Sequence, residues 1–278
     1  LDKIAKSGYD SLSKKEKEDG VRLSCQVKVR GNIKIEIPEE MMSAKEYKAK
    51  VTELKDLTYD TMLLRVDLIK PEIMEFKPGQ YAQLKVPGIE IIRAYSIASN
   101  PKHTNILEFI IRYVPKGKAT TFVHKALMVG DTITLTGPYG DFFLQEDSNK
   151  DIICIAGGSG KAPIRSILSY LKDRGMPRKV KYFFGAKAVK DLYFTEEFRQ
   201  LEKEFPNFQY IPALSDPDED DNWQGETGLI TEVVDRMVGD LSDSEAYLCG
   251  SPGMIDACNK VLDDHNLPLE QCFYDKFS

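Results

Sequence analysis

The stretch "DIICIAGGSGKAPIRSIL" at residues 151–168 decides the fold of the second half of this chain. It opens with an apolar run that ends in glycine, which is typical of a strand buried on both faces of a parallel sheet. After the glycines, residues 162–175 have the spacing of an amphipathic helix. A buried strand, a glycine turn and a helix together predict one unit of a parallel α/β sheet.

The same alternation continues to the end of the chain. Apolar strands are predicted at residues 179–186, 208–215 and 245–252, and amphipathic helices at residues 192–205, 229–238 and 253–266. Strands that alternate with helices favour a parallel sheet with right-handed crossovers. We therefore expect an α/β parallel-sheet nucleotide-binding domain at residues 150–278.

The first half of the chain has a different pattern. From Tyr47 onward, short strands follow one another, and turn signals such as "KPGQ" at residues 77–80 separate them. One short helix is expected at Thr120–Leu127. Regular short strands with little helix between them predict an antiparallel β-barrel. We place this domain at residues 44–146, after a separate segment at residues 1–40.

Composition and charge exclude several classes of protein. The net charge of −6 argues against a nucleic-acid partner, because no broad basic surface is available to neutralise phosphates. No run of about 18 apolar residues is present, so no membrane span is expected. The cysteines are odd in number and lack C-x-x-C spacing, which favours a reducing, cytoplasmic location over a disulfide framework.

Two loops of the α/β half have the chemistry of a nucleotide site. Gly157, Gly158 and Gly160 stand between a buried strand and a helix, where backbone N–H groups and the helix dipole favour a pyrophosphate. The pattern is not G-x-G-x-x-G, so a plain tight turn is the alternative. Cys249 ends another strand, where a ligand of an α/β sheet would lie. The alternative for Cys249 is a small buried apolar residue.

The barrel half contains a third polar cluster in "RAYSIAS" at residues 93–99. Arg93 suits a phosphate, Tyr95 can stack on an aromatic ring, and Ser96 offers a hydrogen-bond donor. The segment "GKATT" at residues 117–121 places glycine and hydroxyl groups before a short helix, which is an anion-binding arrangement. Together these residues predict a pocket for an aromatic ring with a phosphate tail.

Several motifs in a fixed order carry a family resemblance. They are "RAYS", "GKATT", "GPYGDF", "GGSGKAPI", "YFFGAKAVKDLYFTEEF", "CGSPGM" and the terminal "FYDKFS". In this order the chain, from about Tyr47 to its end, resembles the ferredoxin–NAD(P)H reductase superfamily. Within it, the chain is most similar to the FAD-carrying subunit of sodium-translocating NADH:quinone reductases and to the reductase components of phenol and toluene hydroxylases.

The resemblance implies FAD in the barrel domain and NADH in the α/β domain, with NADPH as the alternative. It assigns Arg93 to the flavin pyrophosphate, Tyr95 to the isoalloxazine ring and Ser96 to the region of N5. The residues expected at the flavin are Arg93, Ala94, Tyr95, Ser96, Ile111, Arg112, Tyr113, Gly117, Lys118, Ala119 and Thr120. Those expected at NADH are Gly157, Gly158, Ser159, Gly160, Ala186, Lys187, Cys249, Gly250, Ser251 and Pro252. Phe277 is expected to cover the flavin where nicotinamide must bind, and Ser96, Cys249 and Phe277 are the expected catalytic residues.

The activity implied by the resemblance is an FAD-dependent NADH oxidoreductase. Hydride passes from NADH to flavin N5, and single electrons then pass to a [2Fe–2S] centre and to an acceptor protein or a quinone-reducing complex. Such a protein is expected in the cytoplasm, free or peripheral to a membrane complex. The alternative is a nucleotide-binding regulatory or electron-transfer partner subunit of a larger redox complex. Lys187 and Lys190 follow the second α/β strand and could serve NADPH, but we favour NADH because the similar proteins use it.

The N-terminal segment adds a second resemblance. "RLSCQVKV" at residues 22–29 is similar to the last part of a plant-type [2Fe–2S] ferredoxin domain, in which Cys25 would be the fourth cluster ligand. The other three ligands are absent from this sequence, so we expect a truncated or lost ferredoxin domain and favour truncation. The alternative is an ordinary strand cysteine.

Two positions depart from the family pattern. Lys161 stands where the family usually has Leu or Met, and its side chain is expected either to contact a phosphate or to point to solvent. The segment before "RAYS" is short, at residues 85–92, whereas the subunit of the sodium-translocating enzymes carries a long insertion there. This difference favours the hydroxylase-type reductases over the sodium-pump relatives.

Overall fold

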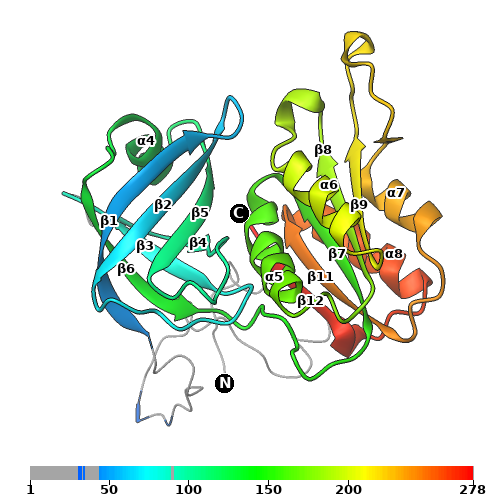
Figure 1. Ribbon diagram of the computed structural model, residues 1–278, viewed down its shortest axis with the longest axis horizontal. Coiled ribbons are helices and arrows are strands. Elements are labelled where there is room, and N and C mark those ends of the chain that lie inside the picture. Colours follow the sequence, from blue (N-terminus) through cyan, green and yellow to red (C-terminus); the bar gives the residue numbers. More distant parts are fainter. Residues whose placement is uncertain (1–30, 33, 35–43, 89–90, 278) are drawn as a thin grey trace. The chain divides into compact units, whose positions relative to one another are not determined.

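A computed structural model of the chain describes residues 31–32, 34, 44–88 and 91–277. Cys25 and the predicted ferredoxin remnant lie outside these residues. The described part contains two sheets, each with its own core (Figure 1). Among the described residues, no helix has the length and apolar character needed to cross a membrane.

The first sheet is antiparallel and has the order β4-β3-β6-β1-β2-β5. Its strands are β1 (Lys45–Asp56), β2 (Thr61–Lys70), β3 (Tyr81–Val86), β4 (Ile91–Ser96), β5 (Ile106–Arg112) and β6 (Thr132–Tyr139). An isolated bridge between Ile97 and Phe109 joins the two edges of the sheet, so the sheet curls into a barrel. This confirms the predicted antiparallel β-barrel.

Alternation explains the barrel strands. In β1, Tyr47, Ala49 and Val51 are buried while their neighbours on either side are exposed or half-buried. Helix α4 (Lys118–Lys125) packs its buried Ala119 and Val123 against the same core. The helix begins two residues before the expected Thr120, because Gly117 ends the preceding loop and serves as the N-cap.

The second sheet is parallel and has the order β10-β9-β8-β7-β11-β12. Its strands are β7 (Asp151–Gly157), β8 (Val180–Ala186), β9 (Phe208–Leu214), β10 (Glu226–Thr227), β11 (Ser244–Gly250) and β12 (Cys272–Lys276). The predicted parallel α/β sheet is therefore confirmed. The sequence analysis missed β10, which has only two residues, and β12, which the C-terminal segment forms along β11.

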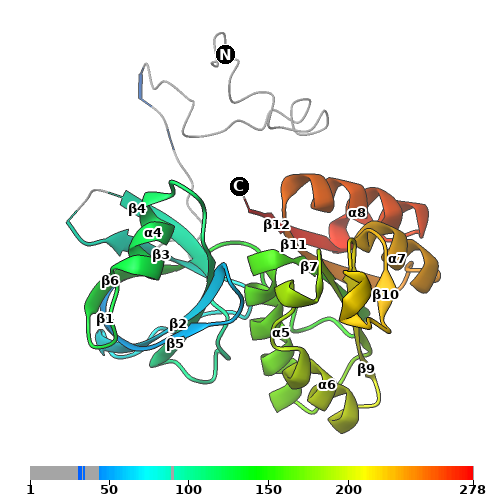
Figure 2. The same ribbon diagram turned by 90° about the horizontal axis from the view of Figure 1, so that it is seen from above.

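Four helices cover the two faces of this sheet: α5 (Lys161–Asp173), α6 (Thr195–Glu204), α7 (Ile230–Met237) and α8 (Pro252–Asp264). Ile164 of α5 and Phe198 of α6 share one core, whereas Val233 of α7 and Ile255 of α8 share another. Figure 2 shows the two pairs of helices on opposite sides of the sheet. Both faces of β7 are therefore buried, which explains its continuous apolar run.

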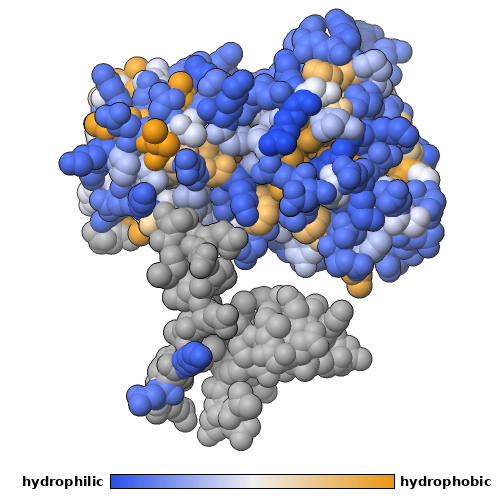
Figure 3. Space-filling view, turned by 60° about the horizontal axis from the view of Figure 1, so that its bottom comes forward, coloured by the Kyte–Doolittle hydropathy of each residue, from blue (hydrophilic) through white to orange (hydrophobic). Residues whose placement is uncertain are grey.

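Polar side chains cover most of the face drawn in Figure 3. Hydrophobic residues gather there in small areas over the barrel domain. The exposed large apolar side chains of the chain include Ile92 beside the "RAYS" segment and Val114 before α4.

Candidate functional site

The glycine loop lies directly on the end of β11. Gly160 has no room for a side chain, since a β-carbon there would lie 2.1 Å from the carbonyl oxygen of Cys249. Gly158 has a φ of +54°, in the left-handed region that favours glycine. The two loops predicted from separate motifs are therefore brought into contact at the carboxyl ends of adjacent parallel strands.

A cavity of about 300 Å³ opens beside this loop. Its lining includes Gly158, Gly185, Ala186, Tyr193 and Met254 of the α/β domain, and Arg112 of the barrel. This position, beyond the carboxyl ends of the strands, is where an open α/β sheet binds its ligand. The expected Ala186 and Lys187 both line the cavity.

Arg112 and Asp60 form an ion pair at the mouth of the cavity. Nε of Arg112 donates to Oδ2 of Asp60 at 2.7 Å. Burial alone would raise the pKa of Asp60, but hydrogen bonds from Arg112, Thr61 and Thr58 lower it below its usual value. A β-carbon built at Gly158 would lie 3.9 Å from Nη1 of Arg112. The guanidinium, assigned by resemblance to the flavin, thus lies beside the glycine loop.

Lys161 contradicts both expectations for it, since its side chain neither faces the cavity nor points to solvent. It is fully buried, with 0% exposure, and Nζ donates to the carbonyl oxygen of Tyr193 at 2.6 Å. The phenol of Tyr193 in turn donates to the carbonyl oxygen of Gly158 at 2.6 Å. The sequence analysis missed Tyr193, because an aromatic residue in a helical segment is usually part of the core.

The end of β11 meets the C-terminal strand. Cys249 pairs with Asp275 of β12, and the backbone N–H of Phe277 donates to the carbonyl oxygen of Gly250 at 2.8 Å. Burial raises the pKa of the Cys249 thiol well above its ordinary value, so this cysteine stays protonated. Burial also raises the pKa of Asp275. Asp275 was not predicted, and its proximity to Cys249 depends on a strand pairing that the sequence does not reveal.

The "RAYS" segment forms β4, at the edge of the barrel sheet. Arg93 and Ala94 are exposed, Tyr95 is half-buried and Ser96 is buried. Among the contacts of the described residues, Nη1 of Arg93 donates to its neighbouring backbone oxygen at Ile92. Burial raises the pKa of Tyr95 to about 12, although Arg93 acts in the opposite direction. An exposed guanidinium and a sheltered phenol ring fit a ligand with a phosphate and an aromatic system.

The start of α4 fits the phosphate of such a ligand. Gly117 provides no capping side chain, and the first turn of the helix contains no acidic residue. The hydroxyl of Thr120 accepts from the N–H of Val114 at 3.1 Å, so this side chain shapes the loop. A β-carbon at Gly117 would lie 2.8 Å from that hydroxyl oxygen. The first amides of the helix can therefore face an anion, and Lys118 adds a positive charge beside them.

The remaining expected residues have varied surroundings. Ile111 is buried in the barrel core, and the ring of Tyr113 packs edge-on to His124 with centroids 5.6 Å apart. Ser251 is the N-cap of α8 and accepts from the N–H of Met254, while Pro252 is the first residue of that helix. Ser159 is half-buried within the glycine loop.

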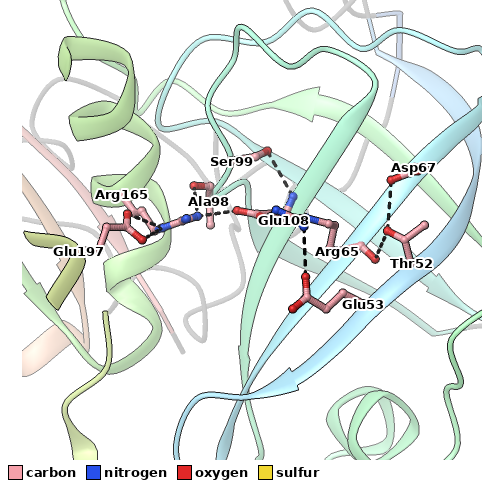
Figure 4. A network of polar contacts seen from close by, with 9 residues as sticks. All are labelled: Thr52, Glu53, Arg65, Asp67, Ala98, Ser99, Glu108, Arg165 and Glu197. Carbon is pink, nitrogen blue, oxygen red and sulfur yellow. Dashed lines mark hydrogen bonds and ion pairs between the residues drawn. The ribbon is translucent and has the colours of Figure 1, made fainter. Parts of the chain in front are cut away.

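A polar network joins the two domains near the glycine loop (Figure 4). Arg165, in the first turns of α5, donates to Glu108 of β5 and to the carbonyl oxygen of Ala98. The hydroxyl of Ser166 donates to the carbonyl oxygen of Ser99 at 2.8 Å. The helix that follows the glycine loop is thereby attached to the segment that follows "RAYS".

Comparisons with known proteins agree with this arrangement of two nucleotide sites. Residues 48–144 match the oxidoreductase FAD-binding domain, and residues 154–260 match the oxidoreductase NAD-binding domain. The chain is similar to the phenol hydroxylase P5 protein of Acinetobacter pittii, with 42% identity over 78% of this chain and 61% of that protein. It is also similar to one subunit of the Na(+)-translocating NADH-quinone reductase of Marinomonas, with 32% identity over 96% of this chain and 76% of the relative.

Among solved structures, the Amycolatopsis cytochrome P450 reductase GcoB superposes with a TM-score of 0.81 and 28% identity, over 99% of this chain and 84% of that chain. The fold, the paired sites and these matches define a flavin- and nicotinamide-dependent oxidoreductase. The chain belongs to the ferredoxin reductase-type family of NAD(H)-dependent flavoproteins. The predicted family and its FAD- and NAD-binding domains are therefore confirmed.

Proposed function

We propose that this chain is an NADH-dependent reductase that supplies single electrons to an acceptor protein or a quinone-reducing complex. The observation that carries the proposal is the meeting of three segments at one point. Gly160 packs on Cys249, Cys249 pairs with Asp275, and Phe277 is hydrogen-bonded to Gly250. A nicotinamide held by the glycine loop would thus lie beside the thiol and the C-terminal aromatic ring.

In the barrel domain, Arg93 and the first amides of α4 would hold the FAD phosphates, and Tyr95 would lie against the ring system. When bound, FAD supplies the capacity to accept a hydride and to release its electrons one at a time. The buried Ser96 hydroxyl would donate a hydrogen bond to the reacting edge of the ring. These roles rest on the exposure of Arg93, the shelter of Tyr95 and the uncapped start of α4.

In the α/β domain, the glycine loop would hold the NADH pyrophosphate, and Arg112 would add a guanidinium next to it. Cys249 would pack its neutral thiol against the nicotinamide and exclude water, since its raised pKa keeps it uncharged. Phe277 would cover the flavin until nicotinamide displaces it, which makes its movement a gating step.

NADH is favoured over NADPH by the charges near Ala186. Nζ of Lys187 lies 3.4 Å from Oδ2 of Asp216, so an acidic group already accompanies this lysine. Asp191 also lines the cavity. A 2′-phosphate would meet these carboxylates, whereas the 2′-hydroxyl of NADH can donate to one of them.

An anaerobic visible spectrum tests the proposal. The chain is reconstituted with FAD, freed of excess cofactor, and titrated with NADH and separately with NADPH. We expect flavin absorption that bleaches with one equivalent of NADH and much more slowly with NADPH. Faster bleaching with NADPH would overturn the choice of nucleotide. Absence of flavin binding, or bound flavin that neither nucleotide reduces, would favour a regulatory nucleotide-binding subunit instead.

The route beyond the flavin is also a proposal. The phenol hydroxylase relative suggests an oxygenase as the acceptor, and the Na(+)-translocating relative suggests a quinone reductase complex. Cys25 is proposed as one ligand of a [2Fe–2S] cluster in a longer form of the protein. Electron paramagnetic resonance of dithionite-reduced longer protein, with a Cys25→Ser variant as the control, tests this ligand. A cluster signal that survives the substitution would reject Cys25.

A further inference from the structure

Lys161 is the first residue of α5, and its side chain runs into the core instead of toward the cavity. Nζ donates to the carbonyl oxygen of Tyr193 at 2.6 Å and lies 3.3 Å from the phenol oxygen of Tyr210. It also lies 3.6 Å from the centre of the Phe184 ring. An amino group without exposure, held by two oxygens and a ring face, is a costly feature that an apolar residue would avoid.

The contacts of Lys161 lead back to the glycine loop by two routes. Its backbone N–H donates to the carbonyl oxygen of Gly158. Its side chain fixes the backbone of Tyr193, whose phenol donates to the same Gly158 oxygen. One residue therefore controls both donors that reach this carbonyl, although the two donors come from different segments of the chain.

The orientation of the Gly158 peptide matters for an anionic ligand. The C=O and N–H groups of a trans peptide point in opposite directions. Because Tyr193 and the start of α5 hold the Gly158 oxygen, the following N–H, of Ser159, points the other way. A pyrophosphate gains from N–H groups and is repelled by carbonyl oxygens. The φ of +54° at Gly158 shows that this peptide orientation needs support from its surroundings.

We propose that Lys161 is a positioning residue for the nicotinamide nucleotide: through Tyr193 it holds the Gly158 peptide with its oxygen turned away from the pyrophosphate. This inference rests on the proposed binding of NADH at the glycine loop. Lys161 touches neither NADH nor the reacting atoms in this arrangement. Its effect should therefore fall on nucleotide binding and leave the chemical step nearly unchanged.

The test compares Lys161→Met, which restores the residue usual in the family, with Tyr193→Phe, which removes only the phenol oxygen. Steady-state rates are measured with NADH and ferricyanide, together with the inhibition constant of ADP-ribose, which carries the pyrophosphate but no nicotinamide. Each variant is expected to raise the KM for NADH and the ADP-ribose constant by about tenfold, the size of one lost buried hydrogen bond to a charged or polar partner. FAD content and kcat should stay within about twofold, a change small in free energy.

The double variant separates a shared route from two independent effects. Because both residues act on one carbonyl, Lys161→Met combined with Tyr193→Phe should raise KM no further than the larger single effect. Lys172→Met is the matched control, since Lys172 is an exposed lysine on the same helix, paired with Glu204. It should leave all constants unchanged.

Three results would overturn the proposal. They are unchanged KM and ADP-ribose constants in Lys161→Met despite a lower melting temperature, fully multiplicative effects in the double variant, and an unaffected KM in Tyr193→Phe. The last result decides the matter even if Lys161→Met fails to fold. Wild-type protein that NADH does not reduce would instead reject the proposed function, and this outcome is distinct from the other three.

Discussion

Nη1 of Arg165 in α5 donates a 2.5 Å hydrogen bond to Oε2 of Glu108 in β5. Glu108 is 5% exposed and also accepts from Arg65, so this carboxylate lies between two guanidinium groups (Figure 4). Burial alone would raise the pKa of Glu108, but Arg165 and Arg65 together lower it below its usual value. The contact joins the helix after the glycine loop to the barrel strand that ends in Arg112.

Glu108→Gln should destabilise the protein by about 3 kcal/mol at pH 7, because it leaves Arg165 largely buried with one carboxylate fewer. The reduction of bound flavin by NADH should slow by about ten- to a hundredfold, since small misplacement of reacting groups has effects of that size. Urea unfolding and stopped-flow reduction measure the two effects. Glu53→Gln is the control: Glu53 pairs with the exposed side of Arg65 and should contribute under about 1 kcal/mol.

The stability difference between wild type and Glu108→Gln should depend on pH with a defined sign. The folded pKa of Glu108 is lowered, so its contribution is complete above the unfolded value of about 4.3. The contribution is lost as pH falls from that value through the folded pKa. Unfolding curves at pH 7, 5 and 3 check this expectation. A difference that grows toward acid pH would contradict the assigned ion pair.

Gly160→Ala should abolish tight NADH binding. A β-carbon at this position would lie 2.1 Å from the Cys249 carbonyl oxygen, so the loop or the end of β11 must move. We expect a loss of about 1–3 kcal/mol in stability, the usual range for overpacking. The KM for NADH should rise at least tenfold, while FAD stays bound. Gly253→Ala is a matched control, because nothing lies within 4 Å of a β-carbon there. An equal effect of both substitutions would mean that backbone freedom, and not the close approach, matters.

The βα unit at residues 151–175 could be predicted because its features are local. Each residue of β7 needs only an apolar neighbour on its own side, so a continuous apolar run indicates a strand buried on both faces. The exposed Arg93 and the capping role of Gly117 are equally local. The domain order, the sheet types and the family followed from such features and from the order of the motifs.

Lys161, Arg112 and Asp275 could not be placed in the same way. The burial of Lys161 depends on Tyr193, Tyr210 and Phe184, which lie far along the chain on other elements. The position of Arg112 depends on a contact between two domains. Asp275 reaches Cys249 only because the C-terminal segment adds a strand to β11. Periodicity reports which face of an element is buried, but it does not report the partner on that face.

Arg93→Ala should weaken FAD binding by about ten- to a hundredfold, the equivalent of a charge-assisted hydrogen bond of about 1.5–3 kcal/mol. The guanidinium is exposed and contributes little to folding, so the melting temperature of FAD-free protein should not change. Fluorescence titration of FAD into the stripped protein measures the dissociation constant. Arg174→Ala provides the control, as Arg174 lies at the end of α5 and pairs with Glu146. An unchanged FAD affinity in Arg93→Ala would place the flavin phosphate elsewhere.

Asp275→Asn should make the protein more stable at neutral pH. Burial raises the folded pKa of Asp275 above the unfolded value of about 3.9, so ionising this carboxyl opposes folding. The carboxyl and the amide should be equivalent below the unfolded pKa. The advantage of the amide should grow as pH rises toward the folded pKa, at about 1.4 kcal/mol for each unit of the shift. Urea unfolding at pH 3.5, 5 and 7 measures this trend. Asp256→Asn, at an exposed partner of Lys276 on α8, should instead show a small loss that hardly changes between pH 5 and pH 7. A lower stability of Asp275→Asn at pH 7 would show that the charged carboxylate is held by a favourable partner, and that its place beside Cys249 is a site for negative charge.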